Sequence, residues 1–272
     1  MSASFPVNEN DQTPRTWRGK VFLWQEQALF LGEAADTSFH ASPAIKLVIA
    51  LDGEFLLRTS ENEAWRGFRS AIISPGQFHA IDGRNKRLAL IVLVPEAKAA
   101  QPLLPIMNRK GISRIPLAVV QNFLPIFADF EEMPVEGVES EKICQKMLKK
   151  IRNGEELLSA ALDERVSHGI ERLRSDAETH FSVGQIAARV ELSESRFSHL
   201  FTEQIGVSMR RYQLWIRLRD AIHLLARGGS LTDTAHEAGF SDSAHLTRTF
   251  RQMLGIAPSA ILKHSSLTVL PE

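Results

Sequence analysis

The sequence contains a single cysteine, Cys144, among 272 residues. One thiol cannot form an intramolecular disulfide or a zinc site built on several thiolates, so both are excluded. Long apolar runs are also missing, because the most apolar stretch, residues 88–95, is far shorter than the ~20 residues of a membrane helix. The polar residues 1–14 lack the apolar run of a signal peptide. We therefore expect a soluble, cytoplasmic protein with no membrane partner.

An excess of charge of either sign is absent as well. The chain has 32 Lys and Arg residues and 32 Asp and Glu residues. No overall field attracts it to nucleic acid, so any affinity for DNA must come from individually placed cations. Hydrophobic residues make up 44 % of the chain, which is ordinary for a globular protein, and the length allows two domains.

Residues 15–95 are predicted to form the first domain, a small antiparallel β-barrel or sandwich. Turn signals at 52–53, 75–76 and 82–83 separate short segments rich in Val, Ile, Leu and Phe. Several short strands at this spacing are typical of such a domain. The segments are residues 21–24, 29–31, 45–51, 55–59, 71–74 and 88–94.

Residues 96–161 are predicted to be a helical linker and a candidate dimerisation region. Prolines divide the first part of this stretch into short pieces. Within 140–153, helical spacing brings Ile143, Met147 and Ile151 to one apolar face. This face either forms a homodimer contact or packs on the chain's own β domain, and the pattern does not choose between them.

From residue 162 onward, all that can be assigned is helical, and one pattern occurs twice. Residues 182–206 and 230–255 each contain a serine cap, a short helix with an alanine, a tight turn, a second serine, a longer helix and a glycine. The matched positions are Ala187 with Ala235, Leu192 with Phe240, Phe197 with His245, and Phe201 with Phe250. The predicted helices are 163–175, 183–190, 194–205, 209–227, 231–238 and 242–254.

This repeat predicts two helix-turn-helix units. The small residue lets the second helix cross the first closely, the apolar residue fills the corner, and the second helix leaves one polar face free. The connecting helix, 209–227, carries an apolar stripe, and Arg210, Arg211, Arg217 and Arg219 are expected outside it. Its length of about 27 Å is close to the ~34 Å between successive major-groove faces.

The stretch from about 163 to 264 resembles the DNA-binding domain of AraC-type (AraC/XylS) transcription regulators. Residues 238–258 carry the most specific part of this resemblance, and residues 217–225 match as well. Met209 and Ala257 depart from the residues usual in the family, at positions away from the expected DNA face. The resemblance implies an α+β chain with an N-terminal cupin-like barrel, a helical linker and an all-α DNA-binding domain at residues 162–264.

The resemblance also implies a function and a set of contacts. It implies a sequence-specific regulator, an activator, that binds double-stranded promoter DNA, contacts RNA polymerase if it activates, and has no catalytic residues, cofactor or metal. The implied base contacts are Ser195, Arg196, Ser198 and His199 in the first unit, and Ser243, Ala244, Thr247 and Arg248 in the second. Arg196 and Arg248 are the expected guanine readers, because a guanidinium can bond O6 and N7 of guanine together.

The β domain resembles cupins more faintly, at residues 74–79. The first cupin segment would supply two histidines and a glutamate, whereas only His40 is present here. His40 and His79 are therefore candidates for a small-molecule effector pocket. They would hold a metal only if a carboxylate joined them. Three alternatives stay open: a barrel that mainly dimerises, a metal-dependent cupin enzyme with a helical domain attached, and a nonspecific nucleoid-type binder.

Overall fold

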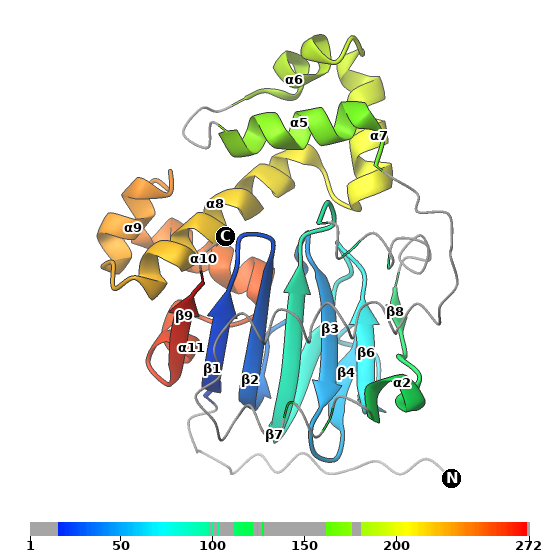
Figure 1. Ribbon diagram of the computed structural model, residues 1–272, viewed down its shortest axis with the longest axis vertical. Helices are drawn as coiled ribbons and strands as arrows, with labels where there is room; N and C mark the ends of the chain where they lie inside the picture. The colour runs from blue at the N-terminus through cyan, green and yellow to red at the C-terminus, as the bar shows by residue number, and fades with distance from the viewer. Residues whose placement is uncertain are drawn as a thin grey trace.

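The chain folds into a mostly-β N-terminal domain and a helical C-terminal domain, as predicted (Figure 1). This structure is a computed structural model. It describes residues 16–97, 111–121, 162–175 and 181–270, together with Ala100, Leu103, Leu124 and Phe127. The predicted helix at 140–153 lies outside the described residues.

The N-terminal domain is built on antiparallel pairs that join β1 to β2, β2 to β7, β7 to β3 and β3 to β6. Its strands are β1 (Arg18–Leu23), β2 (Gln27–Asp36), β3 (Ile45–Ala50), β4 (Phe55–Arg58), β5 (Arg66–Phe68), β6 (Ser70–Ile73), β7 (Ala80–Leu93) and β8 (Ile112–Ser113). Each predicted apolar segment overlaps one of these strands and extends at most one residue beyond it. β5 was not predicted, because its three residues carry no alternating pattern.

The sheet is buried on both faces around β3. Ile45, Leu47 and Ile49 belong to one apolar cluster, which also includes residues that follow β7. Val48 and Ala50 point the other way, into a second cluster between the curved halves of the sheet. A strand covered on both faces has no polar side, which explains why residues 45–50 are almost continuously apolar.

The turn expected at residues 82–83 is wrong. Asp82 and Gly83 lie inside β7, which runs on for 14 residues. Arg84 and Asn85 adopt φ angles of 55° and 53°, and the register against β2 shifts at this point. The sequence signal was therefore a β-bulge. β7 pairs with β2 on both sides of it, while the partner on its other edge changes from β4 to β3.

The C-terminal domain contains the predicted helices within one or two residues at each end. They are α5 (Glu164–Ser175), α6 (Val183–Arg189), α7 (Glu194–Ile205), α8 (Met209–Ala226), α9 (Leu231–Glu237) and α10 (Ser243–Leu254). Two short helices were not foreseen, α11 (Pro258–Leu262) and α2 (Leu117–Gln121) of the linker. In the part of the chain that the structure describes, no helix is both long and apolar enough to cross a membrane.

The expectation that everything after residue 162 is helical is also wrong. β9 (Ser265–Val269) pairs in parallel with β1 and returns the chain to the N-terminal sheet (Figure 1). Its side chains alternate between half-buried and exposed, and Leu267 and Val269 pack on the interior cluster of the β domain. An edge strand of five residues with two apolar side chains gives too short a pattern to be recognised after a helical domain.

Candidate nucleic-acid interface

The first helix-turn-helix unit consists of α6 and α7. α6 begins with a capping box, in which Ser182 Oγ accepts a hydrogen bond from the backbone of Gln185 and the Gln185 side chain accepts one from the backbone of Ser182. Ala187 is fully buried beneath α7. α7 begins after its cap, Ser193, and ends at Gly206, whose φ of 84° is the left-handed conformation that favours glycine.

The second unit, α9 and α10, follows the same plan with one change. α9 is capped by Ser230, as predicted. α10 is capped by Asp242 rather than by the predicted Ser241, because the Asp242 carboxylate accepts the backbone N–H of His245 at 2.6 Å. The turn is thus one residue longer than in the first unit. α10 ends at Gly255, with a φ of 77°.

This longer turn corrects the alignment of the two units. The counterpart of the buried Phe197 is the buried Leu246, and not His245 as the sequence comparison suggested. His245 packs edge-on against Phe240. The equivalent positions on the exposed faces are Ser195 with Ala244, Ser198 with Thr247, and His199 with Arg248. Arg196 takes the position of His245 and so lies about 60° around the helix from His199.

The structure leaves every predicted base contact accessible. Both helices bury the opposite face, through Phe197, Phe201 and Ile205 in α7 and through Leu246, Phe250 and Met253 in α10. The exposed contacts are Ser195, Arg196, His199, Ala244 and Arg248, and the half-buried ones are Ser198, Ser243 and Thr247. Their contact with DNA remains a prediction.

Two further residues share these faces and were missed. Thr202 and Arg251 occupy equivalent positions, three residues beyond His199 and Arg248, and both are exposed. The three-residue spacing along a helix could have found them. On α7 the next residue is acidic: Glu203 lies 3.9 Å from His199.

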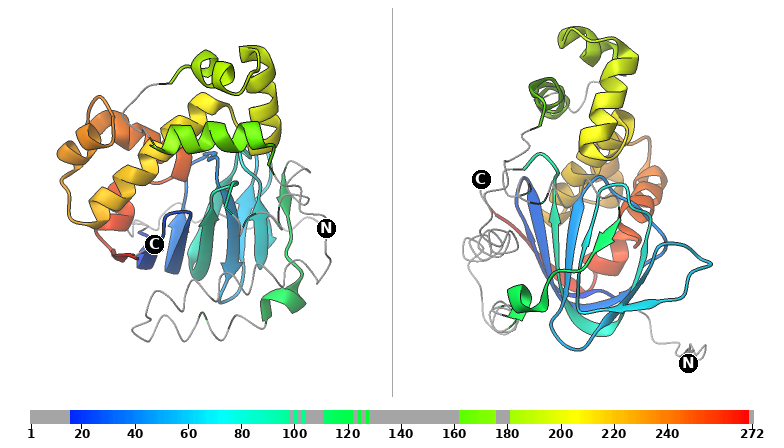
Figure 2. Two further views of the ribbon diagram at one scale, coloured as in Figure 1. Left: turned by 45° about the horizontal axis from the view of Figure 1, so that its top comes forward. Right: turned by 90° about the vertical axis from the view of Figure 1, so that its right-hand side faces the viewer.

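α8 connects the two units and runs diagonally between them (Figure 2). It is 18 residues long, which corresponds to about 27 Å. Tyr212, Trp215 and Leu218 are buried along it. Arg217 was expected on the outside, but it is 9 % exposed and donates to the carbonyl of Gly239 in the turn of the second unit at 3.2 Å. This arginine therefore helps to fix the second unit on α8.

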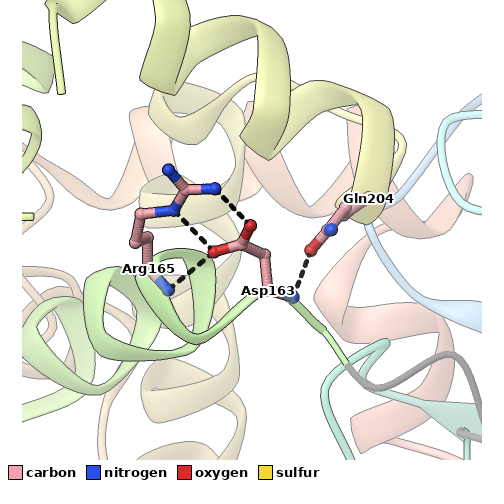
Figure 3. Close-up of polar contacts among 3 residues, drawn as sticks. All are labelled: Asp163, Arg165 and Gln204. Atoms are coloured by element: carbon pink, nitrogen blue, oxygen red, sulfur yellow. Dashed lines mark hydrogen bonds and ion pairs between the residues drawn. The ribbon is translucent and has the colours of Figure 1, made fainter.

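The first unit is held from its other side by α5 (Figure 3). The backbone N–H of Asp163 donates to the Gln204 side chain of α7 at 2.9 Å. The Asp163 carboxylate accepts two hydrogen bonds from the guanidinium of Arg165, at 2.8 and 2.6 Å, which lowers the pKa of Asp163 to about 2. Farther along α5, Gly169 lies so close to Phe197 that a Cβ would not fit.

Comparison with known proteins separates the two domains. Residues 186–264 match the family model described as a helix-turn-helix domain. The arabinose operon regulatory protein of Salmonella typhimurium is 30 % identical over 117 residues, which is 42 % of this chain and 42 % of that protein. The transcriptional activator RhaS of Escherichia coli O139:H28 is 32 % identical over 113 residues, 39 % of this chain and 41 % of that protein. The C-terminal part of the chain is an AraC-type helix-turn-helix domain.

The similarity to these curated relatives covers about two fifths of their length, and it concerns the AraC-type domain. Over most of the chain, the fold is similar to that of ToxT from Vibrio cholerae in its unsaturated fatty acid-bound crystal structure. The TM-score is 0.59 at 14 % identity, over 89 % of this chain and 96 % of that chain. This likeness shows that both proteins share the two-domain fold.

In this chain, residues 37–42 of the β domain contact the end of α10 in the AraC-type domain. The backbone N–H and the hydroxyl of Ser38 both donate to the carbonyl of Gly255, at 2.8 and 3.0 Å. The N–H of Ala41 donates to the carbonyl of Gln252 at 3.3 Å. A β-domain segment is thus attached to the second recognition helix through its backbone.

Residues 74–79 make the corresponding contact with α7. Pro75 packs on Gly206, so closely that an added Cβ would lie 3.1 Å from the Pro75 ring. The two contacting segments are also joined to each other, because His40 and His79 exchange two backbone hydrogen bonds of 3.0 Å. We call these two segments the cap-contact loops. Together they connect the ends of both recognition helices of the AraC-type domain.

The side chains of the two cap-contact histidines meet a buried lysine. His40 and His79 are 2 % and 1 % exposed. Their Nδ1 atoms donate to the carbonyls of Ser38 and Gln77, at 2.9 and 2.8 Å, which leaves each Nε2 as an acceptor. Both Nε2 atoms face Nζ of Lys46, at 2.5 and 3.5 Å.

This cluster favours neutral groups. Burial lowers the pKa of Lys46 to about 7. Burial, together with the charge of Lys46, lowers the pKa of His79 to about 3 and that of His40 well below its usual value. Among the described residues, no group of three His, Cys, Asp or Glu side chains lies together. An amine lies between the two rings, at the place where a metal site would need a carboxylate.

A cavity of about 140 Å³ lies between the interior face of the β domain and the AraC-type domain. It is lined mainly by apolar side chains from both domains, among them Trp17, Phe30, Trp215, Ile222 and Phe250. Neither His40 nor His79 lines it. Lys46 does line it, and its Nζ atom faces the Nε2 atoms of both histidines.

Proposed function

We propose that this protein is a sequence-specific regulator of transcription that binds two successive major-groove segments of promoter DNA. The observation that carries this proposal is the pair of recognition helices, α7 and α10, which α8 joins and which bury one face while exposing the other. α8 is about 27 Å long, and successive major-groove segments lie ~34 Å apart. α7 and α10 could therefore enter two such segments if the DNA bends modestly.

Within this proposal, Arg248 reads a guanine. Arg196 approaches the DNA from the side of α7, about 60° around the helix from His199. The other contacts are those named above, and Arg251 adds a cation to the second reader. Activation, contact with RNA polymerase, homodimer formation and action in the cytoplasm belong to the same proposal, by analogy with relatives such as the activator RhaS. The protein has no catalytic role in it.

The cavity supports control by a small apolar effector. Its lining comes from both domains, so an occupant touches both. The cap-contact loops then offer a route from the occupant to the ends of α7 and α10. The fatty acid bound by ToxT, a protein of the same fold, is consistent with an apolar ligand for this architecture.

Footprinting of the purified protein on genomic fragments tests the proposal. We expect protected sites in which two major-groove segments lie about one helical turn apart on the same face of the duplex. Protection of random DNA with the same affinity, together with a steep salt dependence, would indicate a nonspecific binder instead. Stoichiometric metal in protein purified without chelator, lost in His40→Ala and His79→Ala, would support the cupin enzyme.

Arg248→Ala is expected to weaken binding to the cognate site by about 1–3 kcal/mol and to relax the preference at one base pair. A matched control is Arg66→Ala, which removes one exposed arginine from β5 of the other domain. Competition binding with single-base variants of the site measures both effects. An equal loss on every variant would show that Arg248 contacts only phosphate.

A further inference from the structure

Lys46 is a buried lysine in the cavity lining whose Nζ atom faces two histidine rings. It is 3 % exposed and is the only lysine among the described lining residues. Glu26, Arg219 and His223 also line the cavity, but Lys46 forms no hydrogen bond with them, and burial is the only cause of its lowered pKa. An ammonium ion here would be buried with no carboxylate hydrogen-bonded to it among the described residues, at a large cost in free energy.

The contacts of Lys46 suit a neutral amine. Its nitrogen can donate to the Nε2 atoms of His40 and His79, whose tautomers are fixed by the carbonyls on their other side. A lysine kept unprotonated in an apolar pocket is a nucleophile toward carbonyl compounds. Because the cavity is apolar, it also limits the water that would hydrolyse the product.

We propose that Lys46 binds an apolar aldehyde covalently, as an imine, within this cavity. The proposal rests on the effector role given to the cavity above. The amine lone pair attacks the carbonyl carbon, and Nε2 of His40 takes one amine proton and passes it to the carbonyl oxygen. The resulting carbinolamine then loses that oxygen as water with both amine hydrogens, and a C=N bond remains. No oxidant or reductant is needed.

The cavity volume limits the size of the aldehyde. A cavity of 150 Å³ engineered in another protein holds one benzene molecule, and the present cavity is about 140 Å³. An aldehyde with a single ring of benzene's size is therefore close to the upper limit of this space, and long-chain aldehydes require the lining to move. Benzaldehyde is accordingly the probe of choice.

Imine formation at Lys46 would change the contacts of His40 and thereby affect the end of α10. A neutral imine nitrogen carries no hydrogen, so Lys46 could no longer donate to either histidine. His40 is in close contact with the end of α10, since a Cβ on Gly255 would lie 2.8 Å from its ring carbon Cε1. A change in the position of that ring therefore acts directly on the second reader.

Reductive trapping tests the proposal. The full-length protein is incubated at pH 7 with benzaldehyde and sodium cyanoborohydride, which converts an imine into a stable benzyl amine. We expect a benzyl group on the peptide that contains Lys46. Peptide mapping separates it from any label on the α-amino group, whose usual pKa is about 8. The free-amine fraction of Lys46 at this pH exceeds that of an exposed lysine on the order of a thousandfold, so exposed lysines should label far more slowly.

Lys46→Met should abolish this labelling, and Lys263→Met, at an exposed lysine, should leave it unchanged. If Lys46→Met does not fold, benzyl alcohol serves as an unreactive competitor that should suppress labelling of the wild-type protein. Labelling spread over exposed lysines, or thermal stabilisation by benzaldehyde with no trapped adduct, would overturn the proposal. This readout involves no DNA and the footprinting uses no aldehyde, so each proposal can fail alone.

Discussion

Between pH 7 and about pH 9.5, the free energy of unfolding of the wild-type protein is expected to rise relative to that of Lys46→Met. The pKa of Lys46 is about 7 in the folded protein, against about 10.4 for an unperturbed lysine. Within this window the unfolded chain holds a proton that the folded chain lacks, so stability increases with pH. The slope approaches about 1.4 kcal/mol per pH unit, and the rise across this window is on the order of 3 kcal/mol.

Urea unfolding at a series of pH values measures this difference. Lys46→Met leaves both Nε2 atoms without their donor, but that cost does not vary above pH 7, where both histidines are neutral. Lys263→Met should follow the wild-type profile, because Lys263 is exposed. Below about pH 6.5 the lowered pKa values of His40 and His79 destabilise the wild-type protein in turn. Parallel profiles for wild type and Lys46→Met would show that Lys46 is charged when buried.

Gly255→Ala is expected to destabilise the protein by about 2–5 kcal/mol. A left-handed conformation costs an L-residue about 1–2 kcal/mol, and Gly255 has a φ of 77°. The new Cβ would also lie 2.7 Å from Cβ of Thr37 and 2.8 Å from Cε1 of His40, and closer still to Nδ1 of that ring. Relief of this overlap adds about 1–3 kcal/mol. Because the loop at residues 37–42 must shift, we also expect DNA affinity to change.

Gly228→Ala provides the matched control. Gly228 has a φ of 93°, but nothing lies within 4 Å of an added Cβ. This variant should therefore lose only the conformational part, about 1–2 kcal/mol, and keep its DNA affinity. Thermal unfolding and binding titrations on both variants separate the two contributions. An equal loss of stability in Gly255→Ala and Gly228→Ala would mean that the loop at residues 37–42 moves away from the new Cβ at no cost in free energy.

The recognition units could be predicted from the sequence because their determinants are local. A capping residue, a small residue under the crossing helix and a left-handed glycine act within one unit, and each recurs in the second copy. The exception was the cap of α10. Ser241 was predicted and Asp242 is found, because both of these adjacent residues can cap a helix. Only the geometry shows which of them accepts the amide of His245.

The environment of Lys46 could not be predicted, because it depends on contacts between distant residues. In the sequence, Lys46 interrupts an apolar strand and resembles a surface residue of a half-exposed sheet. Its burial requires the two histidines, 6 and 33 residues away, to meet at one end of the cavity. Arg217 was misplaced for the same reason, since the turn that covers it lies 22 residues farther along.

The return of the chain through β9 has a mechanical consequence for the recognition helices. α10 is followed by α11, and only Lys263 and His264 separate α11 from the strand that is anchored beside β1. The C-terminal side of the second recognition helix is therefore attached to the β domain twice, first through Gly255 and then through β9. A displacement of α10 relative to the sheet therefore requires a change at these two linking residues or the separation of β9 from β1.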